Sequence, residues 1–528
     1  MLSRVSKTNW DVILIGAGMG GGMCARRLAE RGLRVLIIEK GPVGHDREQQ
    51  NISPVISDPV ARTARGAWPK PMQARINGEE SQFFAPVGSG VGGSSVFYAG
   101  ALERPERHDL ETTPDMPHPT GGWAVDYDQF LPYFAQAEDL LHISGTHDPL
   151  SSEPNGNLLE PPVLPAPEAT MMQQMADGGL HPYRLHLSTR NVPGCQMCVG
   201  HKCPKSCKMD GKTAGILPAV ATGRATLLTE CTVVRLDYDA SKVTGVVVSD
   251  GDQEHRVSAQ TVVLAAGAFG SPRLLMMSDI PNTQGCANTS GWVGRGLMFH
   301  INELFAVWPR RGHKFAGASK SISLRDLYTH KGARLGMVQS MGLEADFGNI
   351  SYFLASLYDR SFLKRFKRLR YLLNIPAVIA AEILGNAKIF VGIIEDLPYE
   401  NNRVLLDKTD TDVLSFTYDI PAELYNRRKV FRKQIKKAFS RHRTLLLGQS
   451  LQLNFGHACG TLRFGHDPKT SVLNADCRAH DLDNLYVTDA SFFPTSMGAN
   501  PSLMIAANAL RVADIIATTH HSESTAHV

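Results

Sequence analysis

The segment 456–465 contains a residue type that can move a proton. Its histidine, His457, precedes a glycine turn, and an unperturbed imidazole titrates near pH ~6.5. It can therefore take the hydroxyl proton of an alcohol whose carbon loses a hydride. Asn500, which precedes Pro501, is neutral and could hydrogen-bond the same oxygen without competing for the proton. The alternatives are that His457 only ends a strand and that Asn500 only opens a turn.

A second group of chemically active residues is a cluster of four cysteines in thirteen residues: Cys195, Cys198, Cys203 and Cys207. The spacing C-x2-C-x4-C-x3-C is typical of thiolate ligands for tetrahedral zinc or for an iron–sulfur cluster. A metal-free loop, with or without a disulfide, remains the alternative. The chain has nine cysteines and no apolar leader stretch, so we expect reduced thiols and a cytoplasmic location.

The N-terminal segment predicts a dinucleotide site. Residues 12–15 and 35–38 read as buried parallel strands on either side of a helix that begins after a glycine-rich turn. In that turn Gly16 permits the sharp bend, Gly18 lets a pyrophosphate approach, and Gly21 allows the helix to pack on the strand. Glu39 follows the second strand, where a carboxylate accepts ribose hydroxyls. These residues alone do not separate FAD from NAD.

Four ordered motifs resemble the glucose–methanol–choline (GMC) oxidoreductase family. They are residues 88–98, 267–275, 456–465 and 484–503, the last including Val487-Thr488-Asp489-Ala490-Ser491 and Asn500-Pro501. The resemblance implies that FAD is the cofactor and that His457 and Asn500 meet at the reactive edge of the flavin. It also implies cofactor contacts from Gly93, Ser94, Ser95, Val233, Asp489, Ala490 and Pro501.

The sequence departs from the family pattern in the first motif, where Ser89 and Tyr98 replace the usual residues. Phe97 stands where members with covalent flavin carry histidine, so we expect non-covalent FAD. The spacing of the last three clustered cysteines resembles that of the iron–sulfur-containing bacterial sugar and alcohol dehydrogenases. That resemblance implies a cluster that passes electrons onward.

The fold class expected is α/β, with a discontinuous GxGxxG-type FAD domain and a substrate domain built on an antiparallel sheet flanked by helices. We expect the FAD domain at 1–300, including the cysteine-rich segment 190–210, and again at 454–528, with the substrate domain at 301–453. Strand patterns occur at 302–308, 333–341, 388–395, 402–407 and 413–419. Residues 422–442 read as an amphipathic helix.

The composition limits the partners. A net charge of +4 on 528 residues favours neither nucleic acid nor an acidic partner. A basic run at 364–370 precedes an apolar run at 371–380. This pair could rest on an anionic membrane surface, could cover the mouth of an apolar pocket, or could be a solvated face beside a core helix.

The function expected is oxidation of a sugar, polyol or apolar alcohol to a carbonyl. Electrons would pass to an acceptor other than O₂, such as a quinone or a cytochrome. The alternatives are an oxidase that makes H₂O₂, a non-redox lyase or decarboxylase, and a non-catalytic flavoprotein.

Overall fold

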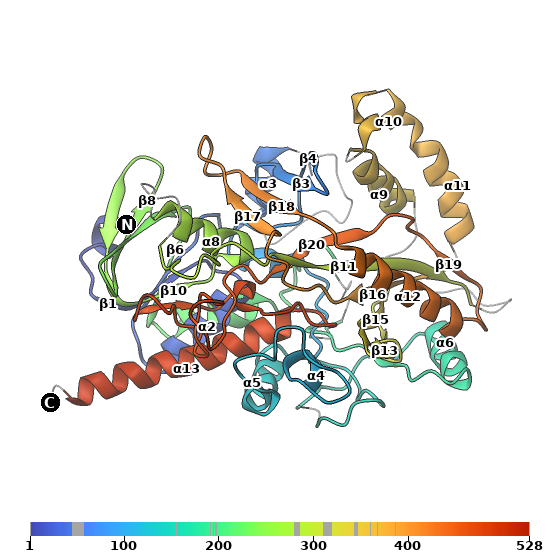
Figure 1. Cartoon of the computed structure of the whole chain (residues 1–528), viewed down its shortest axis with the longest axis horizontal. Coiled ribbons are helices and arrows are strands. Elements are labelled where there is room, and N and C mark those ends of the chain that lie inside the picture. Colours follow the sequence, from blue (N-terminus) through green and yellow to red (C-terminus); the bar gives the residue numbers. More distant parts are fainter. Residues whose placement is uncertain are drawn as a thin grey trace.

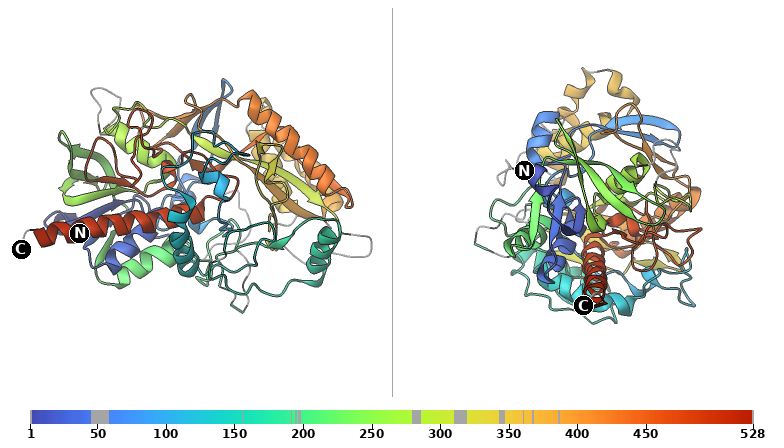
Figure 2. Two further views of the ribbon diagram at one scale, coloured as in Figure 1. Left: turned by 60° about the horizontal axis from the view of Figure 1, so that its bottom comes forward. Right: turned by 90° about the vertical axis from the view of Figure 1, so that its left-hand side faces the viewer.

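The computed structural model describes residues 2–44, 58–154, 156–190, 192–193, 195, 198–278, 286–309, 319–342, 347–359, 361–366, 368–385 and 387–526. Figure 1 shows two layers side by side, one around the parallel strands that hold both termini and one around a long antiparallel sheet. In Figure 1 and in the left-hand view of Figure 2 both chain ends lie on the left-hand side of the molecule.

The first layer is a five-stranded parallel sheet in the order β21-β10-β1-β2-β6. Its strands come from distant segments: β1 (Trp10–Ile15), β2 (Val35–Ile38), β6 (Ala225–Leu228), β10 (Ala259–Leu264) and β21 (Leu485–Val487). Every residue of β2 is buried, as expected for a parallel strand covered on both faces. The α/β class and the discontinuous parallel sheet are therefore confirmed.

Helices and a small sheet cover the parallel sheet. They are α1 (Leu2–Val5), α2 (Met19–Glu30), α5 (Tyr127–Leu140), the π-helical turn η3 (Gly211–Ile216), α7 (Leu217–Ala221), α8 (Gly267–Met277) and α13 (Ser502–Ala526), with β7 (Thr232–Tyr238), β8 (Val243–Ser249) and β9 (Glu254–Val257). α13 packs against α2 and α5. It is apolar and long enough to cross a membrane, yet 67% of its most apolar window is buried inside the fold.

The second layer is a seven-stranded antiparallel sheet. Its path is β19 (Thr444–Leu446), β11 (Met298–Val307), β16 (Lys388–Ile394), β15 (Val338–Ser340), β12 (Ile322–Leu324) and β5 (Tyr183–Arg184), and β20 (Gln452–Cys459) also pairs with β11. β11 and β20 run across the positions where we expected domain boundaries, so those boundaries remain predictions.

The two faces of this sheet have different neighbours, because side chains alternate along each strand. One face carries Phe305, Val338 and Phe390, which pack against α12 (Ala422–Ala438) and α6 (Ala166–Asp177). The other carries Leu304, Val391 and Gln339, which are aligned across β11, β16 and β15. This second face, here called the site face, contacts Ala499 of the C-terminal segment.

Further elements complete the fold. They are α3 (Pro59–Arg65), η2 (Gly93–Val96), α4 (Arg107–Leu110), β13 (Thr329–His330), β14 (Ala333–Arg334), α9 (Phe347–Asp359), η4 (Phe362–Arg365), α10 (Leu369–Leu372), α11 (Asn374–Leu384) and η5 (Ala490–Phe492). The strands predicted at 402–407 and 413–419 are confirmed as β17 (Arg403–Leu406) and β18 (Leu414–Tyr418). They pair with β3 (Met72–Ile76) and β4 (Glu79–Phe83) in a separate sheet.

Candidate active site

His457 is positioned by the pairing of β20 with β11. His300 of β11 lies opposite Asn454 in this pairing, and the register shifts between Met298 and His300. This irregularity brings the ring of His300 against that of His457, with their centroids 4.9 Å apart and their planes at 87°. The two Nδ1 atoms are 3.0 Å apart. The candidate base therefore has an imidazole neighbour from a strand more than 150 residues earlier in the chain.

The hydrogen bonds of His300 determine which nitrogen of His457 carries a proton. His300 Nε2 lies 3.0 Å from the carbonyl oxygen of Met497, which can only accept, so this nitrogen carries the hydrogen. Burial lowers the pKa of His300 to about 4, so its ring is neutral and its Nδ1 is an acceptor. His457 must then donate from Nδ1. Its Nε2 is left with a lone pair, as a general base requires.

The electrostatic surroundings keep His457 unprotonated. Its pKa lies well below the usual value of 6.5, first because burial disfavours the charged ring, and then because the adjacent His300 ring and the amine of Lys320 make a positive charge on His457 electrostatically unfavourable. Lys320 is only 4% exposed, and burial lowers its pKa to about 8. The site therefore combines a neutral imidazole with a buried amine.

Asn500 is held from the site face of the antiparallel sheet. Gln339 of β15 donates from Nε2 to Asn500 Oδ1 over 3.2 Å. Both side chains are buried, with exposures of 1% for Gln339 and 8% for Asn500. Because its oxygen is engaged, Asn500 can present its amide hydrogens to a substrate oxygen. Gln339 Oε1 is buried without a hydrogen-bond partner in the described part of the chain.

The glycine turn after β1 has room for a pyrophosphate. Gly16 has φ +103°, and a side chain there would meet the carbonyl of Ala265 at 2.4 Å. At Gly21 a Cβ would lie 2.1 Å from the Gly16 carbonyl oxygen, so this glycine allows the close packing expected of it. A Cβ on Gly18, in contrast, would have no atom within 4 Å. The open space thus lies where the motif predicts that phosphate approaches the N-terminus of α2.

The segment after residue 88 closes over this turn. A Cβ on Gly93 would lie 2.9 Å from the Cα of Gly18, so η2 rests directly on the glycine turn. Ser95 Oγ donates to the Gly92 carbonyl over 2.6 Å and accepts from the Gly211 amide over 3.0 Å. Ser94 Oγ accepts from the Gly88 amide over 2.9 Å. The two serines therefore fold the loop, and the structure brings it beside Gly18.

Glu39 directly follows β2, as predicted. Its carboxylate is buried and accepts from the amides of Ala17 and Gly41, each over 2.9 Å. Burial raises its pKa, and these amide bonds oppose the rise. The Cys231 amide donates to the Glu39 carbonyl over 3.2 Å, so the strand carrying Val233 begins beside Glu39. Contacts of Glu39 and Val233 with the adenosine half of FAD remain predictions.

Asp489, which is expected to contact FAD, also makes hydrogen bonds that hold the fold together. Its carboxylate accepts from the Gly267 amide over 2.9 Å, from the Ser271 hydroxyl, and from the Ser491 amide over 2.9 Å. It thereby ties the N-termini of α8 and η5 together beside the glycine turn. Ala490 and Pro501 are both buried. Contacts of these three residues with FAD remain predictions.

The clustered cysteines lie beside the loop at residues 88–98, here called the flavin loop because FAD is expected to bind beneath it. Cys203 Sγ is 3.2 Å from Cys207 Sγ, which is 3.9 Å from Cys195 Sγ. Lys208 Nζ donates to the Tyr98 carbonyl over 3.1 Å and to the Cys198 carbonyl over 2.8 Å, which links the segment to the loop. No group of three or more His, Cys, Asp or Glu side chains among the described residues is arranged to hold a metal ion. Metal ligation by these thiols remains a prediction.

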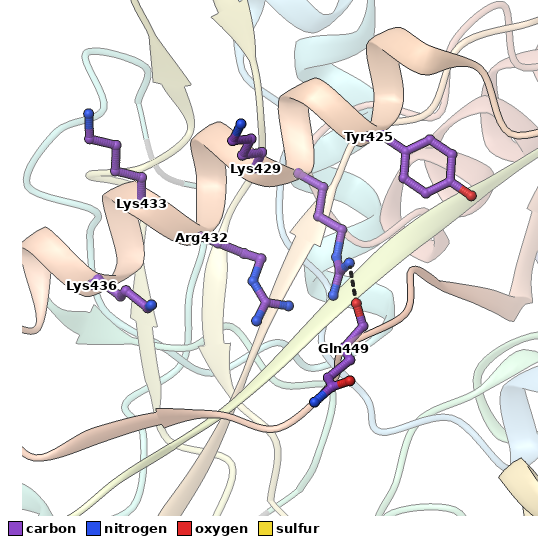
Figure 3. Close-up of a pocket in the computed structure, with 7 residues that line it drawn as sticks. Tyr425, Lys429, Arg432, Lys433, Lys436 and Gln449 are labelled. Atoms are coloured by element: carbon purple, nitrogen blue, oxygen red, sulfur yellow. Dashed lines mark hydrogen bonds between the residues drawn. The ribbon is translucent and has the colours of Figure 1, made fainter.

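A groove of about 450 Å³ elsewhere on the surface is not part of this site. Figure 3 shows that it follows the cationic side of α12, and it is lined by Tyr425, Arg428, Lys429, Arg432, Lys433, Lys436 and Gln449. Phe431 of α12 packs over Gly392 of β16, on the face opposite Gln339. The groove is therefore separated from His457 by the sheet.

Three residues of the site were missed by sequence reasoning: His300, Lys320 and Gln339. None belongs to a motif. His300 and Gln339 reach the site through strand pairing, and Lys320 lies just before β12. A histidine at the start of a buried strand was the one available signal, and it is common in ordinary cores.

Comparison with known proteins identifies the family of the chain. Models of the GMC oxidoreductase family match residues 11–302 and 398–509. The chain is 28% identical to 6'''-hydroxyparomomycin C oxidase of Streptomyces lividus, over 98% of this chain and 93% of that protein. It is 27% identical to 2-methyl-1,2-propanediol dehydrogenase of Mycolicibacterium austroafricanum, over 96% and 95%. Pyridoxine 4-oxidase from Mesorbium loti has a similar structure, with a TM-score of 0.63 at 20% identity, covering 97% of this chain and 99% of that one.

The chain belongs to the GMC oxidoreductase family. It is an FAD-dependent alcohol oxidoreductase.

Proposed function

We propose that His457 Nε2 removes the hydroxyl proton of the substrate alcohol as the carbinol carbon is oxidised to a carbonyl. The observation that carries this proposal is the 3.0 Å contact between the Nδ1 atoms of His457 and His300, which leaves Nε2 unprotonated. FAD held at Gly18, Gly93 and Glu39 supplies the hydride acceptor. Phe97 offers no nucleophile to the cofactor, so the flavin is bound without a covalent link.

Asn500 orients the substrate oxygen. Its amide donates a hydrogen bond to that oxygen while Gln339 holds Asn500 Oδ1. The unpartnered Gln339 Oε1 gives the pocket an acceptor for a second hydroxyl group. A polyhydroxylated alcohol, such as a sugar or a diol, therefore suits the site better than a purely apolar alcohol.

We propose that the electrons leave to an acceptor other than O₂. The position of the cysteine segment against the flavin loop, through Lys208 and Tyr98, supports an onward route. The relatives include a protein named an oxidase and one named a dehydrogenase, so both outcomes need testing. Mixing the alcohol-reduced enzyme with air-saturated buffer separates them: slow reoxidation supports a dehydrogenase, and rapid reoxidation with stoichiometric H₂O₂ identifies an oxidase.

The role of His457 is tested by anaerobic stopped-flow bleaching of the flavin with a panel of polyols and simple alcohols. We expect His457→Ala to lower the reduction rate by at least about 10²-fold, the scale of general base catalysis, with its flavin retained. The matched control is His466→Ala, an exposed histidine of the same segment, which should react at the parent rate. Equal bleaching rates in His457→Ala and the parent would refute the proposal, and no bleaching of the parent by any alcohol would favour a non-redox use of the fold.

A further inference from the structure

Helices α9 to α11 form an apolar surface that the fold leaves exposed. Of the 21 exposed large hydrophobic side chains described, ten lie between residues 347 and 383, so they are concentrated in one projection. They are Phe347, Leu363, Phe366, Leu369, Tyr371, Leu372, Ile375, Val378, Ile379 and Ile383. Figure 1 and the right-hand view of Figure 2 both show these helices standing away from the body of the molecule. We call residues 347–384 the α9–α11 projection.

Helix α11 is apolar on two sides. Ala377 and Leu384 are buried on the side that faces the fold. On the outer side Ile375, Val378 and Ile379 are 61%, 57% and 56% exposed, and their spacing places them on one stripe. The stripe ends at one charged side chain, Glu382, which is exposed one turn beyond Val378 and Ile379. A helix that is apolar on both its inner and outer sides is normally buried in a core or in a membrane interface. α11 is therefore not a core helix, and its outer stripe needs an apolar partner.

Positive charge lies next to the apolar stripe. The run 364–370 has five cationic residues in the sequence, and Arg365, Arg368 and Arg370 are exposed in the structure. Anionic lipid headgroups attract such clusters, and an apolar helix beside them can lie in the plane of the interface. This charge complementarity favours a membrane over a neutral apolar partner.

The inner side of the projection packs against the second layer, the seven-stranded antiparallel sheet, which is called the substrate layer from here on. Ala380 and Leu384 of α11 pack with Ala306 of β11 and Ile389 of β16. Ala306 and Ile389 are paired across the sheet, on the same face as Leu304 and Val391. That is the site face, which also carries Gln339. The projection thus covers the outer end of the surface that holds the substrate site.

We propose that the α9–α11 projection docks the enzyme on an anionic membrane surface, with the outer stripe of α11 in the headgroup region and the arginines on the phosphates. The docking is peripheral and reversible. It places the substrate layer, and not the end that carries the two chain termini, toward the lipid.

The test uses the full-length flavin-loaded enzyme in a sedimentation assay with vesicles. Vesicles of phosphatidylcholine alone are compared with vesicles that also contain phosphatidylglycerol. We expect binding to the anionic vesicles that weakens with added salt, since the charge attraction is screened. The triple variant Ile375→Gln, Val378→Gln, Ile379→Gln should lower the partition coefficient at least tenfold. Arg365→Gln, Arg368→Gln, Arg370→Gln should do the same for anionic vesicles.

Two control variants test whether vesicle binding depends on this surface or on exposed apolar and cationic residues in general. Lys429→Gln, Lys433→Gln, Lys436→Gln removes three cations from the α12 groove, and Val60→Gln, Val163→Gln removes two of the most exposed valines elsewhere. Both should bind vesicles like the parent. An unchanged flavin spectrum and unfolding temperature show that each variant is folded.

Three results would overturn the proposal. The parent enzyme could stay in the supernatant with both kinds of vesicle. The α11 variant could bind as well as the parent does. Finally, the parent could fail to bind vesicles and instead self-associate in sedimentation velocity, while the α11 variant stays monomeric. That result would identify the projection as an interface between two copies of the chain.

Discussion

The rings of His300 and His457 meet at nearly a right angle, with their Nδ1 atoms 3.0 Å apart. His300 is itself hydrogen-bonded to the Met497 carbonyl, so the pair forms a short relay that ends on the main chain. The relay fixes both the orientation of His457 and its tautomer. His300 is thus a positioning residue, because its contact is with the base and with the backbone.

Replacing His300 should reveal this positioning role. His300→Leu removes the acceptor for His457 Nδ1, and we expect flavin reduction to slow about tenfold, a barrier increase of about 1.4 kcal/mol. His300→Asn keeps an oxygen acceptor near the position of Nδ1 and should recover part of the rate. Anaerobic stopped-flow kinetics measure both variants at saturating alcohol. Equal losses in both would indicate that only packing around the ring matters.

The Gln339–Asn500 hydrogen bond can be tested by changing its polarity. Gln339→Glu replaces the donor with an acceptor, so Asn500 must turn its amide and present its oxygen to the substrate. We expect kcat to fall about tenfold or more with a smaller change in KM, because the alkoxide-like oxygen loses a donor during the reaction. Gln339→Met, which has no charge and a similar length, should lose less. If Gln339→Met is the worse of the two, the amide orientation does not control the rate.

The rate of flavin reduction should decline on the acid side only at an unusually low pH. His457 must be neutral to act, and its pKa lies well below 6.5 because of burial and because of the neighbouring His300 ring and Lys320 amine. The rate should therefore stay constant as pH falls through 6.5 and should decline only at lower pH. Lys320→Met removes a positive charge, so the pKa of His457 should rise and the acid limb should move toward neutral pH. A limb that stays in place in Lys320→Met would show that the amine does not act on the base.

Two glycines of the turn after β1 should respond differently to alanine. A Cβ on Gly18 would enter open space, whereas a Cβ on Gly20 would lie 2.0 Å from the Thr488 carbonyl oxygen. We expect Gly18→Ala to fold normally but to retain at least about tenfold less flavin, since backbone approach to the pyrophosphate needs that space. Gly20→Ala should instead lower the yield of folded protein. Flavin absorbance per protein and circular dichroism distinguish the two effects, and full flavin occupancy in Gly18→Ala would contradict the assignment.

The parts of the site that the sequence predicted are those encoded by neighbours in the chain. The turn at Gly16, Gly18 and Gly21 forms between β1 and α2, and Glu39 directly follows the next strand, so a short segment contains its whole geometry. The same holds for α12, predicted at 422–442 and found at Ala422–Ala438, because an amphipathic period is a local property.

The parts that could not be predicted depend on strand pairing between distant segments. His300 reaches His457 only because β11 pairs with β20, and Gln339 reaches Asn500 only because β15 lies in the same sheet. Strand patterns also do not say which sheet a strand joins. β18 was predicted inside the substrate region, yet it pairs in parallel with β3, more than 300 residues earlier. Nothing in a strand's own residues encodes such a partner.

Because the relay from His457 ends on a peptide carbonyl, its final acceptor has no side chain that a mutation could delete. Substitutions on the site face around Gln339 should therefore change which alcohol is accepted while the protonation of His457 stays the same. An engineer seeking a new specificity would vary the residues around Gln339 and leave Lys320, His300 and His457 unchanged.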